Sequence, residues 1–209
     1  MTRRYWTLAF LATARSFGAS DFWNKKDLSR WTTDDILRLA TNSPWAKKAR
    51  VIPLPGRDRG SLQSTGVDIA GAGGRSGNQR VGEIPIVSVT EVTVIWESAQ
   101  PLLDALKTNL PRDFANHYVI GVDDLPPEEG GRKVNLESMT ASLQAHGKES
   151  VDAGGIESNK GVVLFSFSKE LLPLAAADKE VLFTLETNQY SVKCRFDFKE
   201  MMYHGKLAV

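Results

Sequence analysis

The chain has 209 residues, of which 42% are hydrophobic and 24% are charged, a balance typical of a globular protein with one domain and flanking segments. Its formal net charge is +1, and loss of a leader that carries three arginines would lower it to −2. A nearly neutral protein has no general electrostatic attraction for nucleic acid, so we expect no nucleic-acid partner.

The first twenty residues have the three parts of a secretory signal peptide. Arg3 and Arg4 form a positive start, residues 5–14 form a mainly apolar run, and small residues lead up to Ser20, where we expect cleavage. The apolar run has about half the length that a membrane-spanning helix needs. We therefore expect a periplasmic or secreted protein, with the membrane crossed by the signal peptide only and no permanent transmembrane anchor. The alternative is a cytosolic protein whose N-terminal helix imitates a leader.

Residues 21–55 are expected to form a short helical segment. Thr32 can cap a helix whose first turn contains Asp35, three residues later, and the sequence Asn42-Ser43-Pro44 ends it. Its predicted apolar face consists of Ile36, Leu37, Leu39 and Ala40. A helix of about nine residues is not stable alone in water, so this one must pack on something.

The same segment is rich in tryptophan, with Trp23, Trp31 and Trp45. Two interpretations are open. The three rings can anchor the segment to the main domain of the same chain, or they can form a docking patch for another envelope protein or a cell-wall polymer. We take all three as candidate partner-docking residues.

Residues 56–82 contain 8 of the 17 glycines and no aromatic residue. This composition cannot bury enough apolar surface to offset the entropy of ordering, so we predict a disordered, flexible linker. The run Gly71–Gly77 superficially matches a phosphate-binding loop, but it lacks the preceding strand and the following helix. We expect no cofactor.

Residues 83–209 are predicted to form the main α+β domain. Strands are expected at 84–96, 117–122 and 161–168, with a helix that begins near Ser98 and carries Pro101 in its first turn. Residues 134–147 could be a helix from Asn135 or a strand over Thr140–Gln144, and the serine and threonine content favours the strand slightly.

The last third of the domain predicts a hairpin of two strands, 180–186 and 190–198. Cys194, the only cysteine, lies on the apolar side of the second strand with Val192, Phe196 and Phe198, so we interpret it as a small core residue. One or two helices against a mostly antiparallel sheet make α+β the predicted fold class.

Five short motifs of this chain resemble an uncharacterised family of exported bacterial proteins, and together they span most of the chain after the leader. The resemblance implies export and implies no activity, cofactor or catalytic residue. The motifs are Trp31-Thr32, Ser43-Pro44-Trp45-Ala46, Trp96-Glu97-Ser98-Ala99, Asp178-Lys179-Glu180-Val181 and Tyr203-His204-Gly205-Lys206-Leu207, and the glycine-rich stretch lies between the second and the third.

A search for catalytic patterns gives no catalytic residue and no metal site. The three histidines, His117, His146 and His204, are far apart in the sequence and match no metal-ligand spacing. Calcium binding by Asp123, Asp124, Glu128 and Glu129 is less favoured than a solvated loop, because the glycine and spacing of an EF-hand loop are missing.

The sequence therefore favours a non-enzymatic binding or scaffold module of the cell envelope. The alternative is a hydrolase or carbohydrate-active enzyme that uses carboxylates such as Glu97, Asp123 or Asp124. That alternative requires two of these carboxylates to face each other across a concave pocket.

Overall fold

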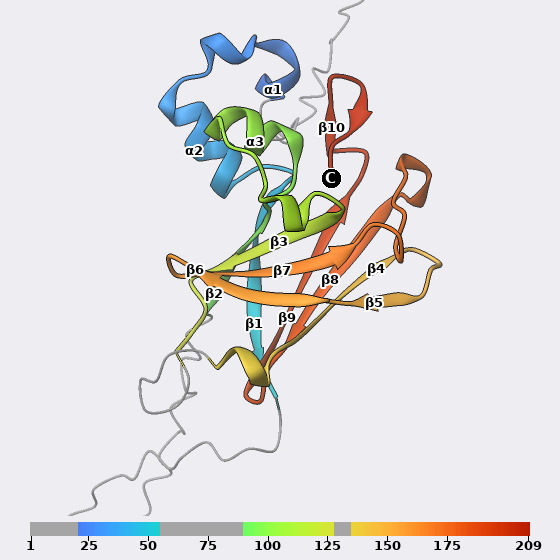
Figure 1. Cartoon of the computed structure of the whole chain (residues 1–209). Coiled ribbons are helices and arrows are strands. Elements are labelled where there is room, and N and C mark those ends of the chain that lie inside the picture. Colours follow the sequence, from blue (N-terminus) through green and yellow to red (C-terminus); the bar gives the residue numbers. More distant parts are fainter. Residues whose placement is uncertain (1–20, 55–89, 128–134) are drawn as a thin grey trace, which may run out of the picture.

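The computed structural model describes residues 21–54, 90–127 and 135–209 (Figure 1). The predicted signal peptide, 1–20, and the predicted linker, 56–82, lie outside the described residues, as do Glu128 and Glu129.

The described residues form a mostly antiparallel sheet with a few short helices, which confirms the α+β class in its coarse form. Nine strands pair in the order β5-β4-β8-β9-β1-β2-β3-β7-β6. They are β1 (Ala46–Pro53), β2 (Glu91–Trp96), β3 (His117–Asp123), β4 (Thr140–Ala145), β5 (Ser150–Asp152), β6 (Gly155–Asn159), β7 (Val162–Ser168), β8 (Glu180–Glu186) and β9 (Tyr190–Asp197). A separate two-stranded hairpin of β10 (Met202–Tyr203) and β11 (Lys206–Leu207) follows.

The helices gather at one end of the sheet, beside the β10–β11 hairpin (Figure 1). In the part of the chain that the structure describes, the α-helices are α1 (Phe22–Lys25), α2 (Thr33–Thr41) and α3 (Gln100–Leu106). Single 3₁₀ turns lie at η1 (Leu28–Arg30), η2 (Arg112–Phe114), η3 (Leu136–Ser138) and η4 (Ala176–Asp178).

The sheet curls back on itself because two stretches of chain pair with both of its halves. The first half of β1 pairs with β2, and its last three residues, 51–53, pair with β9. At the other side, β5 runs into β6 through Ala153 and Gly154. The Ala153 amide donates to the Ala141 carbonyl of β4 at 2.8 Å, and the Gly154 amide donates to the Ser166 carbonyl of β7 at 2.9 Å. The stretch 150–159 therefore joins the two end strands of the sheet.

The core fills the space between the layer β2-β3-β7 and the layer β4-β8-β9 with aromatic rings. The ring centroids of Trp96 and Phe196 lie 5.2 Å apart, and those of Phe165 and Phe183 lie 5.7 Å apart. The predicted apolar side of β9 is confirmed, because Val192, Cys194 and Phe196 are buried while the residues between them, 193 and 195, are exposed. Cys194 is a buried core residue as predicted, and its burial raises the pKa of its thiol to about 12.

The expected helical character of 21–55 is wrong for its last third. Residues 46–53 form β1, which lies in the middle of the sheet, so the folded domain begins before residue 83. Hydrogen bonds to β2 on one side and β9 on the other satisfy the backbone of β1, and these long-range ladders outweigh its weak local pattern.

Residues 134–147 follow the favoured alternative, a strand. Thr140–Ala145 forms β4, and Gly147 has φ +76° in the turn that follows it, a conformation that glycine adopts without strain. Asn135 caps the short η3 turn by accepting a hydrogen bond from the Glu137 amide.

Helix α3 is present, but it begins one residue later than the Ser98 cap implies. Its N-cap is Ala99, and the Ser98 hydroxyl instead accepts a 3.1 Å hydrogen bond from the Val119 amide of β3. Pro101 lies in the first turn as predicted. Leu37, which the sequence placed on the apolar face of the first predicted helix, is 60% exposed.

Candidate functional site

The N-terminal segment is attached to the sheet by a cluster of four aromatic side chains, which we call the aromatic cluster: Phe22, Trp23, Trp31 and Trp45. Their rings meet edge to face, with centroids 5.2 Å apart for Phe22–Trp23, 5.3 Å for Phe22–Trp31 and 5.3 Å for Trp23–Trp45. Such contacts favour packing beyond the burial of apolar area alone.

The structure places the three candidate docking tryptophans unequally. Trp45 is 0% exposed and Trp23 is 4% exposed, so these two rings anchor the segment within the chain and offer no exposed patch. Trp31 is half-buried and donates to the Lys26 carbonyl at 3.2 Å. A docking surface built from the exposed faces of all three rings is therefore not formed.

The C-terminal hairpin holds the aromatic cluster in place. The Trp45 indole Nε1 donates to the Ala208 carbonyl at 2.6 Å. Asn24 connects α1 to the same hairpin, because its Nδ2 donates to the Met202 carbonyl at 3.0 Å and its Oδ1 accepts from the His204 amide at 2.8 Å. The two ends of the described chain are thus joined by direct hydrogen bonds.

Helix α2 is fixed at its start by the predicted cap. The Thr32 hydroxyl accepts from the Asp35 amide at 3.2 Å, and the Asp35 carboxylate accepts from the Thr32 amide at 3.0 Å, which completes a capping box. The Lys26 ammonium lies 2.8 Å from the Asp35 carboxylate. Its hydrogen bond, followed by that of Thr32, lowers the pKa of Asp35.

The end of α2 is fixed as well, by Ser43. Its hydroxyl donates to the Leu39 carbonyl at 2.6 Å and accepts from the Trp45 amide at 3.2 Å. The turn from α2 into β1 is therefore rigid, and it positions Asn42 and Pro44.

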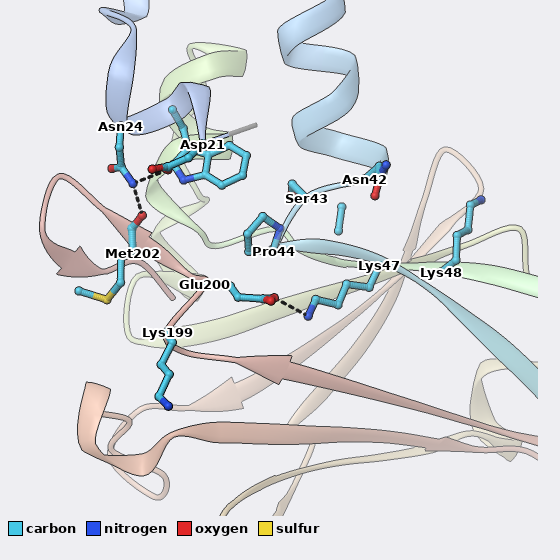
Figure 2. Close-up of a pocket in the computed structure, with 12 residues that line it drawn as sticks. Asp21, Asn24, Asn42, Ser43, Pro44, Lys47, Lys48, Lys199, Glu200 and Met202 are labelled. Carbon is cyan, nitrogen blue, oxygen red and sulfur yellow. Dashed lines mark hydrogen bonds and ion pairs between the residues drawn. The ribbon is translucent and has the colours of Figure 1, made fainter. Parts of the chain in front are cut away.

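A cavity of about 650 Å³ opens where α1, this turn and the segment after β9 meet (Figure 2). We call it the charged cavity. It is lined by Asp21, Trp23, Asn24, Asn42, Ser43, Pro44, Ala46, Lys47, Lys48, Lys199, Glu200 and Met202. Its volume lies within the range of about 300–1,000 Å³ that is typical of small-ligand sites.

The charged groups of the cavity differ in their partners. Figure 2 shows Lys47 and Glu200 pointing toward each other, and their charged atoms lie 3.3 Å apart. The Lys48 ammonium donates to the Thr93 hydroxyl at 2.7 Å and lies 4.0 Å from the Asp124 carboxylate. The Lys199 ammonium has no acceptor among the residues of 21–54, 90–127 and 135–209, and it is exposed. Figure 2 shows its side chain pointing away from the other lining residues.

Two further groups of the cavity lack partners in the described part of the chain. The Asn42 side-chain amide is exposed and makes no hydrogen bond there, which leaves both a donor and an acceptor free. The Trp23 Nε1 is buried and has no acceptor there either. Together with Pro44, Ala46 and Met202, the Trp23 ring gives the cavity an apolar part.

The structure places the candidate carboxylates of the enzyme alternative on one sheet surface, outside this cavity. The Glu97 side chain packs over Gly121. A Cβ added at Gly121 would lie 2.9 Å from Glu97 Oε1. Burial, and then the nearby Asp123 charge, raise the pKa of Glu97. Asp124 lies 4.0 Å from Lys48. Neither the charged cavity nor a second cavity of about 450 Å³, lined by residues 148–152 and 171–173, includes Glu97, Asp123 or Asp124.

The other residues considered for chemistry are not brought together. His117 begins β3, His146 lies in the turn after β4, and the His204 ring stacks against Tyr203 with centroids 4.0 Å apart. Within the described ranges, no group of three or more His, Cys, Asp or Glu side chains could hold a metal ion.

Burial, and then a hydrogen bond to Asp104, raise the pKa of Tyr203 to about 12.

Sequence reasoning identified the tryptophan segment but missed most of the cavity. The sequence marks Asn42 only as part of a helix stop, and Lys199 and Glu200, which follow β9, belong to no recognisable motif. No local signal could have found them, because the cavity is assembled from three segments that are far apart in the sequence.

None of the helices in the described ranges combines the length and the apolar character needed to cross a membrane. Comparison of the chain with family models, with curated proteins and with solved structures found no match.

Proposed function

We propose that this protein is exported and acts as a non-enzymatic binding module of the cell envelope, with the charged cavity as its binding site. The observation that carries the proposal is the cavity itself. It has the volume of a ligand site, and its lining leaves the Asn42 side-chain amide and the buried Trp23 Nε1 without partners among the described residues.

The walls of the cavity favour binding over catalysis. The two carboxylates in its lining are already engaged, Asp21 by the Asn24 amide at 2.8 Å and Glu200 by Lys47. The lining contains no histidine or cysteine that could act as a base or nucleophile at neutral pH. The site residues therefore support recognition of polar and charged groups.

The surroundings of the cavity are pre-organised. The Ser43 hydrogen bonds fix one wall, and the Asn24 hydrogen bonds to the C-terminal hairpin fix another. A site that is already ordered loses less entropy when a ligand binds, so modest contacts can give useful affinity. The partner that we propose is another envelope protein or a cell-wall polymer.

The binding proposal can be tested by blocking the cavity. Cys194 is buried with a thiol pKa of about 12, so an introduced surface cysteine can be labelled selectively. We expect Asn42→Cys carrying a bulky maleimide to lose crosslinked envelope partners. A Lys193→Cys variant with the same label, on the exposed side of β9, should keep them. Equal recovery of crosslinked partners from both labelled variants would show that the cavity is not the binding site.

Blocking the cavity with a label tests the binding proposal more cleanly than deletion of residues 21–50. That deletion would remove most of β1 and the aromatic cluster, so lost partners would report only unfolding.

The export proposal has its own test, fractionation followed by N-terminal sequencing. We expect the protein in the periplasm or medium with a new N-terminus at residue 21. Recovery from the cytosol of a chain that still begins at Met1 would overturn the envelope role.

A further inference from the structure

Asp21, the first residue after the expected cleavage point, is also part of the wall of the charged cavity. Figure 2 shows it on the side of the cavity formed by α1, next to Asn24. Residues that precede Asp21 are bonded to its backbone nitrogen. A folded chain that retains them therefore has them attached directly to the cavity lining.

The attachment point is held in place. The Asn24 side-chain amide donates to the Asp21 carboxylate at 2.8 Å, and the same side chain bonds to two backbone groups of the C-terminal hairpin. The next two residues, Phe22 and Trp23, are only 5% and 4% exposed. The first residues of a domain are ordered when the fold ties them down in this way. Asp21 therefore cannot move away from the cavity without breaking these contacts.

The residues just before Asp21 suit the cavity in length and in chemistry. Three extended residues span about 10 Å, enough to reach across a cavity of about 650 Å³. Gly18-Ala19-Ser20 is small and uncharged, so it can enter without breaking the Lys47–Glu200 ion pair, and Pro44 offers it apolar surface. Because the segment is tethered, its effective concentration at the cavity is on the order of millimolar, which a weak external ligand does not match.

We infer that the charged cavity is regulated by the position of cleavage: it is open in a chain that begins at Asp21, and residues 18–20 occupy it in any folded chain that retains them. This inference rests on the proposed function, because it concerns export and the same cavity. Hydrolysis of the Ser20–Asp21 peptide bond by a signal peptidase leaves the water oxygen in the Ser20 carboxylate and both water protons on the Asp21 nitrogen, which becomes an α-ammonium. Only the correctly cleaved protein is then competent to bind its partners.

The test compares two purified forms of the Asn42→Cys variant, one that begins at Asp21 and one that begins at Gly18, each released from a cleavable fusion. The labelling rate of the introduced thiol with the bulky maleimide is measured for both. Because only molecules with an open cavity react, we expect labelling at least about three-fold slower in the chain from Gly18. Lys193→Cys, on the exposed side of β9, is the matched control and should react at the same rate in both forms.

Amide NMR shifts of the unsubstituted protein give a second measurement that needs no introduced thiol. Between the two forms we expect shifts at 42–48 and 199–202, which line the cavity far along the chain from residues 18–20, as well as at 21–24. Shifts confined to 21–24, or equal labelling rates for the two forms of Asn42→Cys, would overturn the inference.

Failure of this inference can be told apart from failure of the proposed function. If both forms react equally fast while the labelled Asn42→Cys chain from Asp21 still loses its envelope partners, the regulation is wrong and the binding site stands. If labelling is slower in the chain from Gly18 but the labelled chain from Asp21 keeps its partners, residues 18–20 fill the cavity as inferred and the proposed binding function is wrong.

Discussion

The indole Nε1 of Trp45 donates a 2.6 Å hydrogen bond to the carbonyl oxygen of Ala208, and both residues are buried. This single contact joins the start of β1 to the last residues of the chain. It helps to explain why the tryptophan segment is part of the domain.

Trp45→Phe should destabilise the protein by about 2–4 kcal/mol, because it leaves a buried carbonyl without its donor and opens space in the aromatic cluster. Trp31→Phe is the matched control, since Trp31 is half-buried and its hydrogen bond is exposed. It should cost about 1 kcal/mol or less. Urea unfolding measures the loss of unfolding free energy in each variant. Equal losses would mean that the hydrogen bond to Ala208 contributes no more than that of Trp31.

Asp35 makes the stability pH-dependent in the acid range. Its folded pKa is lowered from 3.8, so the stability that it adds is complete above 3.8 and is lost as pH falls through the lowered folded value. We expect Asp35→Asn to cost about 1 kcal/mol at pH 6, the usual size of a cap interaction, and nearly nothing near pH 2. Unfolding free energies of both proteins across this range check the prediction. A constant difference at every pH would contradict it.

Glu97 should make the stability of the folded protein depend on pH in the opposite direction. Its folded pKa is raised above 4.5, first by burial and then by Asp123, so ionisation of Glu97 opposes folding and stability falls as pH rises through that range. The Glu97→Gln variant removes this loss. We expect its stability relative to the unchanged protein to be greater at pH 7 than at pH 4, as measured by urea unfolding. A stability difference between the two proteins that is the same at both pH values would contradict this prediction.

Gly121 leaves the space that the Glu97 side chain occupies. A Cβ at residue 121 would lie 2.9 Å from Glu97 Oε1 and 3.0 Å from Val162 Cγ1, so Gly121→Ala forces a neighbour to move. We expect a cost of about 1–3 kcal/mol. In a Glu97→Ala background the cost should be smaller, because one of the two clashes is gone. A double-mutant cycle measures this coupling, and a coupling of zero would show that Glu97 moves aside freely.

The strands with clear alternation and the cap with a local motif could be predicted from the sequence. β9 alternates apolar and polar residues, β7 and β8 are rich in valine, leucine and phenylalanine, and Thr32 with Asp35 forms the expected capping box. These features depend on neighbouring residues, so their signals are local.

The remaining strands depend on partners that are distant in the sequence. β1 contains Lys47, Lys48 and Arg50 and shows no regular alternation, and its pairing with both β2 and β9 makes it a strand. β5 and β6 are short and largely polar, and backbone hydrogen bonds to β4 and β7 define them. The cavity has the same origin, since residues 42–48 and 199–202 come together only after these long-range pairings form.

The sharing of β1 between two layers has a consequence for biosynthesis. Its second partner, β9, and the Ala208 carbonyl are synthesised long after β1 itself. The sheet cannot curl closed before β9 has been made, and folding that depends on such distant contacts is slow. A chain synthesised only as far as β8 therefore leaves the last three residues of β1 unpaired with β9.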